Sequence, residues 1–217
     1  MDPTLEMIVT PFVAALVVAV AAVMLGAVNI SNMLWGSKKT RGIERKAEVA
    51  PPDSEPGPAV VLAIVATLAL GTLCALYVTL TLLALAESYP IGVLQMPQPE
   101  AVRALGAAVF AAGAALFSWS VIARGRYSVT WAMPVDQKLV TWGPYRYVRH
   151  PSYTGYFLMF AGLFLTWFNL LAAIPLLGIP GYYRISMREE RMLALRFGDS
   201  YTRYQKKTGR FFPRLSG

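Results

Sequence analysis

The segment GPYRYVRHPSYTG, residues 143–155, gathers polar and aromatic residues that together can bind a charged ligand. It holds the only histidine of the chain, His150, and a long apolar run follows it. A residue before proline is pushed out of the α region, and proline suits the first turn of a helix, so we expect a new helix to begin at Pro151. Residues 143–150, called the strap below, are then expected to be ordered and non-helical, and to end at a helix N-terminus that attracts anions. With Arg149 and the three tyrosines, this pattern predicts a site for a ligand that has a carboxylate and a cationic or planar group. The alternative is an ordinary belt of aromatic and basic residues at a membrane surface.

A second group of polar residues lies in RISMREERMLALRFGDSYTRYQKKTG, residues 184–209, which is expected to be helical to about Phe197. Helical spacing places Glu190 on the apolar face, whereas Glu189 lies about 100° around the helix and is expected to be partly solvated. An inward carboxylate is costly unless it is paired, so Glu190 either pairs with an arginine of the strap or holds the ammonium group of a ligand. The residues that share its face are Met187, Leu193, Ala194 and Phe197, with Tyr201 and Tyr204 beyond Gly198 if the helix continues.

The composition indicates an integral membrane protein. Of the 217 residues, 56% are hydrophobic and 15% are charged, against about 25% charged in a typical soluble domain. The net charge of +8 fits the cytoplasmic side of a membrane, so we expect the lipid bilayer and not nucleic acid as partner. The single cysteine, Cys74, has no partner for a disulfide or a metal site, so no metal is expected.

Hydropathy and charge together predict an all-α protein with about five transmembrane helices. Apolar runs over residues 7–34, 59–86 and 101–123 each exceed the roughly 20 residues that span a bilayer. A fourth run, 153–183, has basic residues at both ends, so we expect a helical hairpin that turns near Trp167–Asn169. All basic residues except Arg103 then lie on the cytoplasmic side, with the N-terminus outside and a cytoplasmic helical tail.

Two regions are predicted from this organisation. Residues 1–123 hold three transmembrane helices, the first two expected to serve as a membrane anchor, with a Pro-rich connector at 37–58. Residues 124–217 hold the strap, the hairpin and the C-terminal helix, and form the expected ligand-binding core.

The segments LVTWGPYRYVRHPSYTGYFLMFAGLFL and REERMLALRFGDSYTRYQKKTGRFFP resemble the isoprenylcysteine carboxyl methyltransferase and phospholipid methyltransferase superfamily of integral membrane enzymes. The resemblance covers Lys138 to Pro213 and rests on the paired RHPxYxG and EE motifs. It implies S-adenosylmethionine as cofactor, bound on the cytoplasmic side, with Glu190 near the cofactor's amino end. The cofactor-binding positions that it implies are Lys138, Leu139, Gly143, Tyr145, Arg149, His150, Pro151, Tyr153, Gly155 and Glu190.

The resemblance also implies a lipophilic acceptor, most simply the carboxylate of an isoprenylcysteine, with a phospholipid amine or a small thiol as alternatives. We expect such an acceptor to enter laterally from the bilayer, and the compact length is typical of a prokaryotic plasma-membrane member. The sequence does not identify catalytic residues. The candidates for orienting or contacting the substrate are His150, Tyr201, Tyr204 and Arg210, and we favour a binding role for His150. An NADPH-dependent sterol-type reductase and a non-catalytic lipid-binding protein are the alternatives from other classes; the inward Glu190 favours the methyltransferase.

Overall fold

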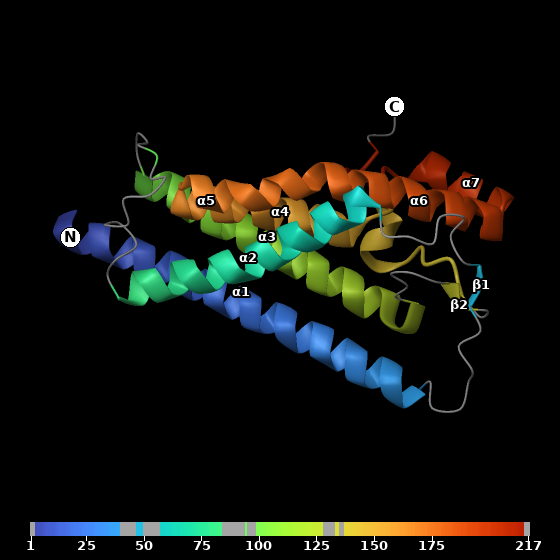
Figure 1. Cartoon of the computed structure of the whole chain (residues 1–217), viewed down its shortest axis with the longest axis horizontal. Helices are drawn as coiled ribbons and strands as arrows, with labels where there is room; N and C mark the ends of the chain where they lie inside the picture. Colours follow the sequence, from blue (N-terminus) through green and yellow to red (C-terminus); the bar gives the residue numbers. More distant parts are fainter. Residues whose placement is uncertain are drawn as a thin grey trace.

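The computed structural model describes residues 3–39, 47–49, 57–83, 94, 99–127, 133–134 and 137–214. Figure 1 shows the long helices running along one axis, with the N-terminus at one end and α7, β1 and β2 at the other. The predicted all-α membrane protein is confirmed, and one antiparallel pair of very short strands, β1–β2, is added to it. The elements are α1 (Pro3–Lys39), β1 (Ala47–Val49), α2 (Pro58–Leu82), α3 (Pro99–Arg124), η1 (Gly125–Tyr127), β2 (Met133–Pro134), η2 (Gly143–Arg146), α4 (Pro151–Trp167), α5 (Leu170–Ala173), η3 (Ile174–Gly178), α6 (Ile179–Phe197) and α7 (Asp199–Lys207).

Within the described residues, four segments are long and apolar enough to cross a membrane: Pro11–Ser31, Pro58–Leu82, Glu100–Arg124 and Leu170–Phe197. The outward faces of α1 and α2 expose many large apolar side chains, as expected for helices in lipid. With 17 residues, α4 is at the lower limit of about 17–25 residues for a spanning helix. The predicted count of five spans and the predicted sidedness therefore stay predictions.

Helices α3 and α4 pack closely because glycines face each other along their contact. A Cβ atom on Gly113 would lie 2.7 Å from the carbonyl oxygen of Gly155, and one on Gly155 would lie 2.8 Å from that of Gly113. At Gly106 and Gly162 an added Cβ would lie 2.5 Å from a backbone nitrogen of the opposite helix. Small residues that let backbones approach are the usual means by which membrane helices associate. This contact fixes the start of α4, and with it the strap, relative to the end of α3.

The predicted hairpin is confirmed, with its turn at the expected place. Helix α4 ends at Trp167, Phe168 adopts the left-handed conformation (φ 46°), and the side chain of the buried Asn169 accepts a hydrogen bond from the Leu171 backbone nitrogen at 2.8 Å. The second arm runs through α5, η3 and α6 and packs on α2, where a Cβ on Gly181 would lie 2.6 Å from a backbone oxygen. The hairpin therefore returns the chain to the end of the molecule where α4 began.

One local prediction is wrong. Residues Gly143–Arg146 form the 3₁₀ helix η2, because Gly143 turns the chain with a φ of +58° and Pro144 suits a first helical turn; only the second half of the strap is non-helical. The expected end of the helix at about Phe197 is confirmed: Gly198, with a φ of +50°, ends α6, and a separate helix, α7, begins at Asp199.

The predicted connector at 37–58 lies outside the described residues except for the end of α1, the strand β1 and the start of α2. The predicted division into 1–123 and 124–217 stays a prediction.

Candidate active site

The strap is joined by its main chain to the segment after α7, residues 208–214, called the C-terminal segment below. Val148 and Gly209 form a parallel bridge, the Arg149 nitrogen donates to the Gly209 oxygen at 2.8 Å, and the His150 nitrogen donates to the Arg210 oxygen at 3.0 Å. Residues about 60 positions apart thus form one unit at the N-terminus of α4.

Glu190 holds this unit to α6. Its Oε1 accepts hydrogen bonds from Arg149 Nε at 2.9 Å and Arg210 Nε at 3.0 Å, and lies 3.2 Å from His150 Nε2. Its Oε2 accepts from Arg210 at 2.9 Å and from Gln205 at 3.3 Å. Its side chain is only 6% exposed, so the prediction of an inward Glu190 is confirmed. Of the two alternatives that the sequence left open, the structure shows the pairing with a strap arginine, Arg149, and both carboxylate oxygens already accept hydrogen bonds.

His150 lies between two carboxylates. Its Nδ1 is 3.3 Å from Glu189 Oε2, while its Nε2 faces Glu190. Burial lowers the pKa of His150, but the hydrogen bonds to both carboxylates outweigh burial, so the pKa is raised above its ordinary value. The ring is also stacked on Tyr153, whose hydroxyl donates to Glu189 Oε1 at 2.7 Å. The arrangement favours a protonated, fixed imidazolium.

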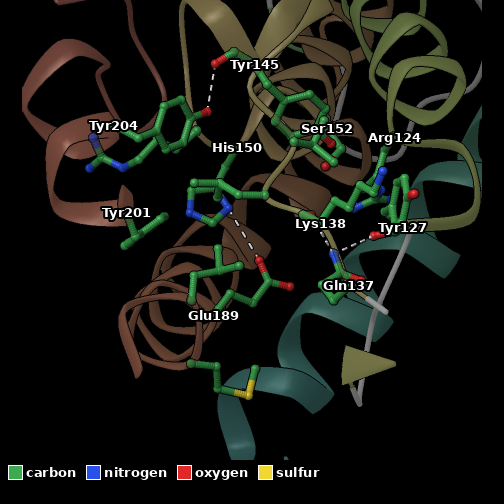
Figure 2. Close-up of a pocket in the computed structure, with 15 residues that line it drawn as sticks. Arg124, Tyr127, Gln137, Lys138, Tyr145, His150, Ser152, Glu189, Tyr201 and Tyr204 are labelled. Atoms are coloured by element: carbon green, nitrogen blue, oxygen red, sulfur yellow. Dashed lines mark hydrogen bonds and ion pairs between the residues drawn. The ribbon is translucent and has the colours of Figure 1, made fainter. Parts of the chain in front are cut away.

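A polar cavity opens beside His150 (Figure 2). Figure 2 shows Glu189 facing His150 on one side, and Arg124, Tyr127 and Gln137 on the other. Its volume is about 100 Å³, which is smaller than the roughly 300–1,000 Å³ of usual ligand sites, so a nucleoside-sized ligand requires the walls to move apart. The lining residues are Arg124, Tyr127, Gln137, Lys138, Leu139, Val140, Tyr145, Arg149, His150, Ser152, Glu189, Met192, Leu193, Tyr201 and Tyr204.

Several lining residues present buried polar atoms that no described residue satisfies. They include Arg124 Nε, Gln137 Oε1 and the Tyr201 hydroxyl. Burial raises the pKa of Tyr201 well above its ordinary value, so its hydroxyl keeps its proton as a donor. Buried polar groups are nearly always hydrogen-bonded, and an unsatisfied one costs about 1–3 kcal/mol. Three such atoms, two donors and one acceptor, belong to residues that line one cavity, and a movement of the walls that admits a polar ligand would let them pair with it.

The structure gathers half of the predicted binding positions at this cavity. The predicted residues that line it are Lys138, Leu139, Tyr145, Arg149 and His150, together with the candidates Tyr201 and Tyr204. The predicted residues that do not line it are Gly143, Pro151, Tyr153, Gly155, Glu190 and Arg210. Gly155 packs against α3, Pro151 is buried in the first turn of α4, and Glu190 pairs with Arg210 behind His150.

Sequence reasoning missed several lining residues. Arg124 had one available signal, a basic residue in the last turn of an apolar helix. Glu189 is partly solvated as expected, with its side chain 20% exposed, but its place in the cavity wall was not predicted. Gln137, Ser152 and the apolar Met192 carry no pattern that separates them from their neighbours. They reach the cavity only because α4, α6 and the segment before η2 meet there.

Comparison with known proteins agrees with the resemblance. Residues 101–200 match the family model described as phospholipid methyltransferase. The chain is 41% identical over 75 residues to the protein-S-isoprenylcysteine O-methyltransferase of Schizosaccharomyces pombe, covering 33% of this chain and 31% of that protein. It is 36% identical over 85 residues to the protein of the same name from Tribolium castaneum, covering 38% and 30%.

A third relative has a different name. The nickel-cobalt-cadmium resistance protein NccN of Alcaligenes xylosoxydans xylosoxydans is 40% identical over 80 residues, covering 36% of this chain and 38% of that protein. In all three cases the match spans less than two fifths of the relative's own length. The predicted resemblance to the isoprenylcysteine carboxyl methyltransferase and phospholipid methyltransferase superfamily is confirmed for the matched region.

Proposed function

From the resemblance of residues 101–200 to membrane methyltransferases, we propose that this protein transfers a methyl group from S-adenosylmethionine to a lipophilic acceptor. The observation that carries the proposal is the polar cavity, in which an acid, basic side chains and unsatisfied polar atoms converge beside His150. The most favoured acceptor is a carboxylate of the isoprenylcysteine type, after the printed names of two relatives.

The lining residues fit the chemistry of S-adenosylmethionine, which supplies an electrophilic methyl group on a sulfonium when bound. Glu189 offers a carboxylate for the ligand's ammonium group, and Arg124 and Lys138 offer cations for its carboxylate. Tyrosine faces attract a sulfonium and stack on an adenine, and Tyr127 and Tyr201 supply such faces. Unsatisfied donors and acceptors at the wall would pair with the ligand's polar atoms.

We assign the ammonium contact to Glu189 and a positioning role to Glu190. Glu190 is the position that the resemblance implies, but its oxygens meet two arginines, His150 and Gln205, and it does not line the cavity. Glu189 lines the cavity next to His150. In this assignment Glu190 holds the strap in place, and His150 orients Glu189 toward the ligand.

The environment of His150 favours a carboxylate acceptor over an amine or a thiol. An ionised carboxylate is already a nucleophile, whereas an ammonium or a thiol must first lose a proton to a base. Both nitrogens of the only histidine face carboxylates, so neither is available as a base in this arrangement. The residues around the cavity would then act by positioning the reactants and excluding water, which suits an in-line methyl transfer.

The proposal is tested first by binding. Isothermal titration of the detergent-solubilised protein with S-adenosylhomocysteine and, separately, with NADPH is expected to show binding of the first only. Binding of NADPH alone would instead support the sterol-type reductase. The second test is transfer of a radiolabelled methyl group to N-acetyl-S-farnesylcysteine, to a phosphatidylethanolamine and to methanethiol, of which we expect the first to be the preferred acceptor. Methylation of methanethiol as fast as of the lipidated acceptor would overturn the proposal that the acceptor is lipophilic.

A further inference from the structure

A second cavity lies among the membrane helices and shares no lining residue with the polar cavity. Its volume is about 480 Å³, within the roughly 300–1,000 Å³ typical of ligand sites. This is about three times the volume of an apolar cavity of roughly 150 Å³ that was engineered into another protein and binds benzene. Most of its lining comes from α1 and α2, outside the segment that matches the family. We call it the apolar cavity; its lining residues are Val18, Ala19, Ala22, Leu25, Asn29, Thr67, Leu70, Gly71, Cys74, Ala75, Val78, Thr79, Phe110, Phe117 and Tyr156.

Gly71 leaves space in this cavity. No heavy atom lies within 4 Å of the position of a Cβ on Gly71, whereas a Cβ on Gly113 or Gly162 would meet the backbone of a packed helix below 3 Å. Glycine inside a helix costs about 0.5–1 kcal/mol relative to alanine, and here no close packing requires it. Gly71 itself is exposed, so the apolar cavity is a groove that opens to the outside of the helices, and a groove of this size between membrane helices can take an apolar chain.

Packed aromatic side chains lie between the two cavities. Tyr156 lines the apolar cavity and its ring lies 5.2 Å from that of Tyr182, whose hydroxyl is hydrogen-bonded to Thr67, another lining residue. The Tyr182 ring lies 5.0 Å from Tyr153, and Tyr153 is stacked on His150 at the polar cavity. The Thr67 end of the apolar cavity is therefore the end nearer to the polar cavity, with the rings of Tyr182 and Tyr153 packed between them.

The length of the cavity suits one hydrocarbon chain. Along α2 the lining runs from Thr67 to Thr79, which is about 18 Å at 1.5 Å per residue. This is about three fifths of the roughly 30 Å hydrocarbon thickness of a bilayer. Figure 1 shows α2 running away from the end of the molecule that carries α7, so Thr67 is the end nearer to the polar cavity. A lipid chain with its polar group at Thr67 would extend toward Thr79.

We propose that the apolar cavity binds the hydrocarbon chain of the acceptor and that Gly71 keeps it open, which sets the longest chain accepted. This inference rests on the proposed function, since it names where that reaction's acceptor lies. The chain leaves one apolar medium, the bilayer, for another, so selection comes from the shape of the cavity and not from transfer out of water. Gly71 lies one helical turn from Thr67, so a large side chain there closes the cavity close to its polar end.

The test compares the same substitution at two glycines. Gly71→Leu fills the apolar cavity, and Gly26→Leu is the matched control, because Gly26 is exposed on α1, has no heavy atom within 4 Å of a Cβ, and does not line the cavity. Both substitutions bring the same gain in helix propensity. Methyl transfer is measured with the S-prenyl and the S-farnesyl derivative of N-acetylcysteine. We expect Gly71→Leu to lower kcat/KM for the farnesyl acceptor at least about tenfold, or about 1.4 kcal/mol, and to leave the prenyl acceptor and S-adenosylhomocysteine affinity unchanged.

Photolabelling tests whether the apolar cavity binds the hydrocarbon chain even if the protein shows no methyl transfer. An N-acetylcysteine whose sulfur carries a long alkyl chain with a terminal diazirine should label α1 or α2 in the wild type and in Gly26→Leu, but not in Gly71→Leu. Labelling elsewhere, or equal labelling of both variants, would overturn the inference, as would equal farnesyl kinetics. A wild type that binds no S-adenosylhomocysteine and methylates neither acceptor would sink the proposed function, while photolabelling would still decide what the apolar cavity holds.

Discussion

Replacing Glu190 by glutamine is expected to lower the stability of the protein, because Glu190 holds the strap and the C-terminal segment to α6. We expect its effect on ligand affinity to be indirect. The carboxylate accepts hydrogen bonds from Arg149, Arg210 and Gln205 and faces His150. Removing one partner of a buried ion pair costs about 3–5 kcal/mol, because the other charge stays buried and unpaired. Arg210 is 27% exposed and regains water, which favours the lower value of about 3 kcal/mol, or roughly a 150-fold change in the unfolding equilibrium.

Thermal unfolding in detergent measures this effect. A loss of about 3 kcal/mol lowers Tm by roughly 6–12 °C for a chain of this size. Glu100→Gln is the control, because Glu100 lies in the first turn of α3, at the opposite end of the bundle from α7, and its substitution should leave Tm unchanged (Figure 1).

Glu189→Gln should show the opposite profile. Its side chain is 20% exposed and bonds only Tyr153 and His150 in the described structure, so we expect a smaller change in Tm. A charge-assisted hydrogen bond to the ligand's ammonium is worth about 1.5–3 kcal/mol, so the Kd for S-adenosylhomocysteine should rise about 10- to 150-fold. If Glu190→Gln keeps its Tm and loses the ligand, while Glu189→Gln binds normally, the roles given to the two acids are reversed and the reasoning fails.

Three further predictions concern packing, pH and topology. Gly113→Val is expected to cost about 1–3 kcal/mol or more, because its Cβ would lie 2.7 Å from a backbone oxygen of α4, whereas Gly26→Val should leave Tm unchanged; equal Tm values would contradict the close α3–α4 contact. Because the pKa of His150 is raised in the folded state, its protonation stabilises the fold fully at pH values below the ordinary pKa of 6.5, and this contribution is lost as the pH rises through the folded-state pKa. Tm should therefore fall between about pH 6 and about pH 9, and His150→Gln should remove that part of the fall. Single cysteines at Ser54 and Ser216, in a background without the native cysteine, should react with an impermeant reagent from the same side of the membrane, and opposite sides would exclude the predicted hairpin topology.

Much of the membrane architecture could be predicted because it depends on properties that are local in the sequence. Apolar runs of sufficient length gave the helices α1, α2 and α3, and the basic residues on both sides of 153–183 gave the hairpin. The prediction of a non-helical strap was wrong for its first half, because a glycine at positive φ followed by a proline starts a 3₁₀ helix as readily as an extended segment. The end of the helix at Phe197 could be predicted for a local reason too, since a positive φ at glycine ends a helix.

The sequence by itself determined that Glu190 is buried and that His150 precedes a helix, because periodicity and proline act within a few residues. Only the tertiary structure decided what each acid does. Arg210 reaches Glu190 because the C-terminal segment pairs with the strap, and Glu189 reaches the polar cavity because α6 returns beside α4. The apolar cavity likewise depends on how helices from separate parts of the chain fail to fill the space at Gly71, and such a space is a property of their packing that no single helix encodes.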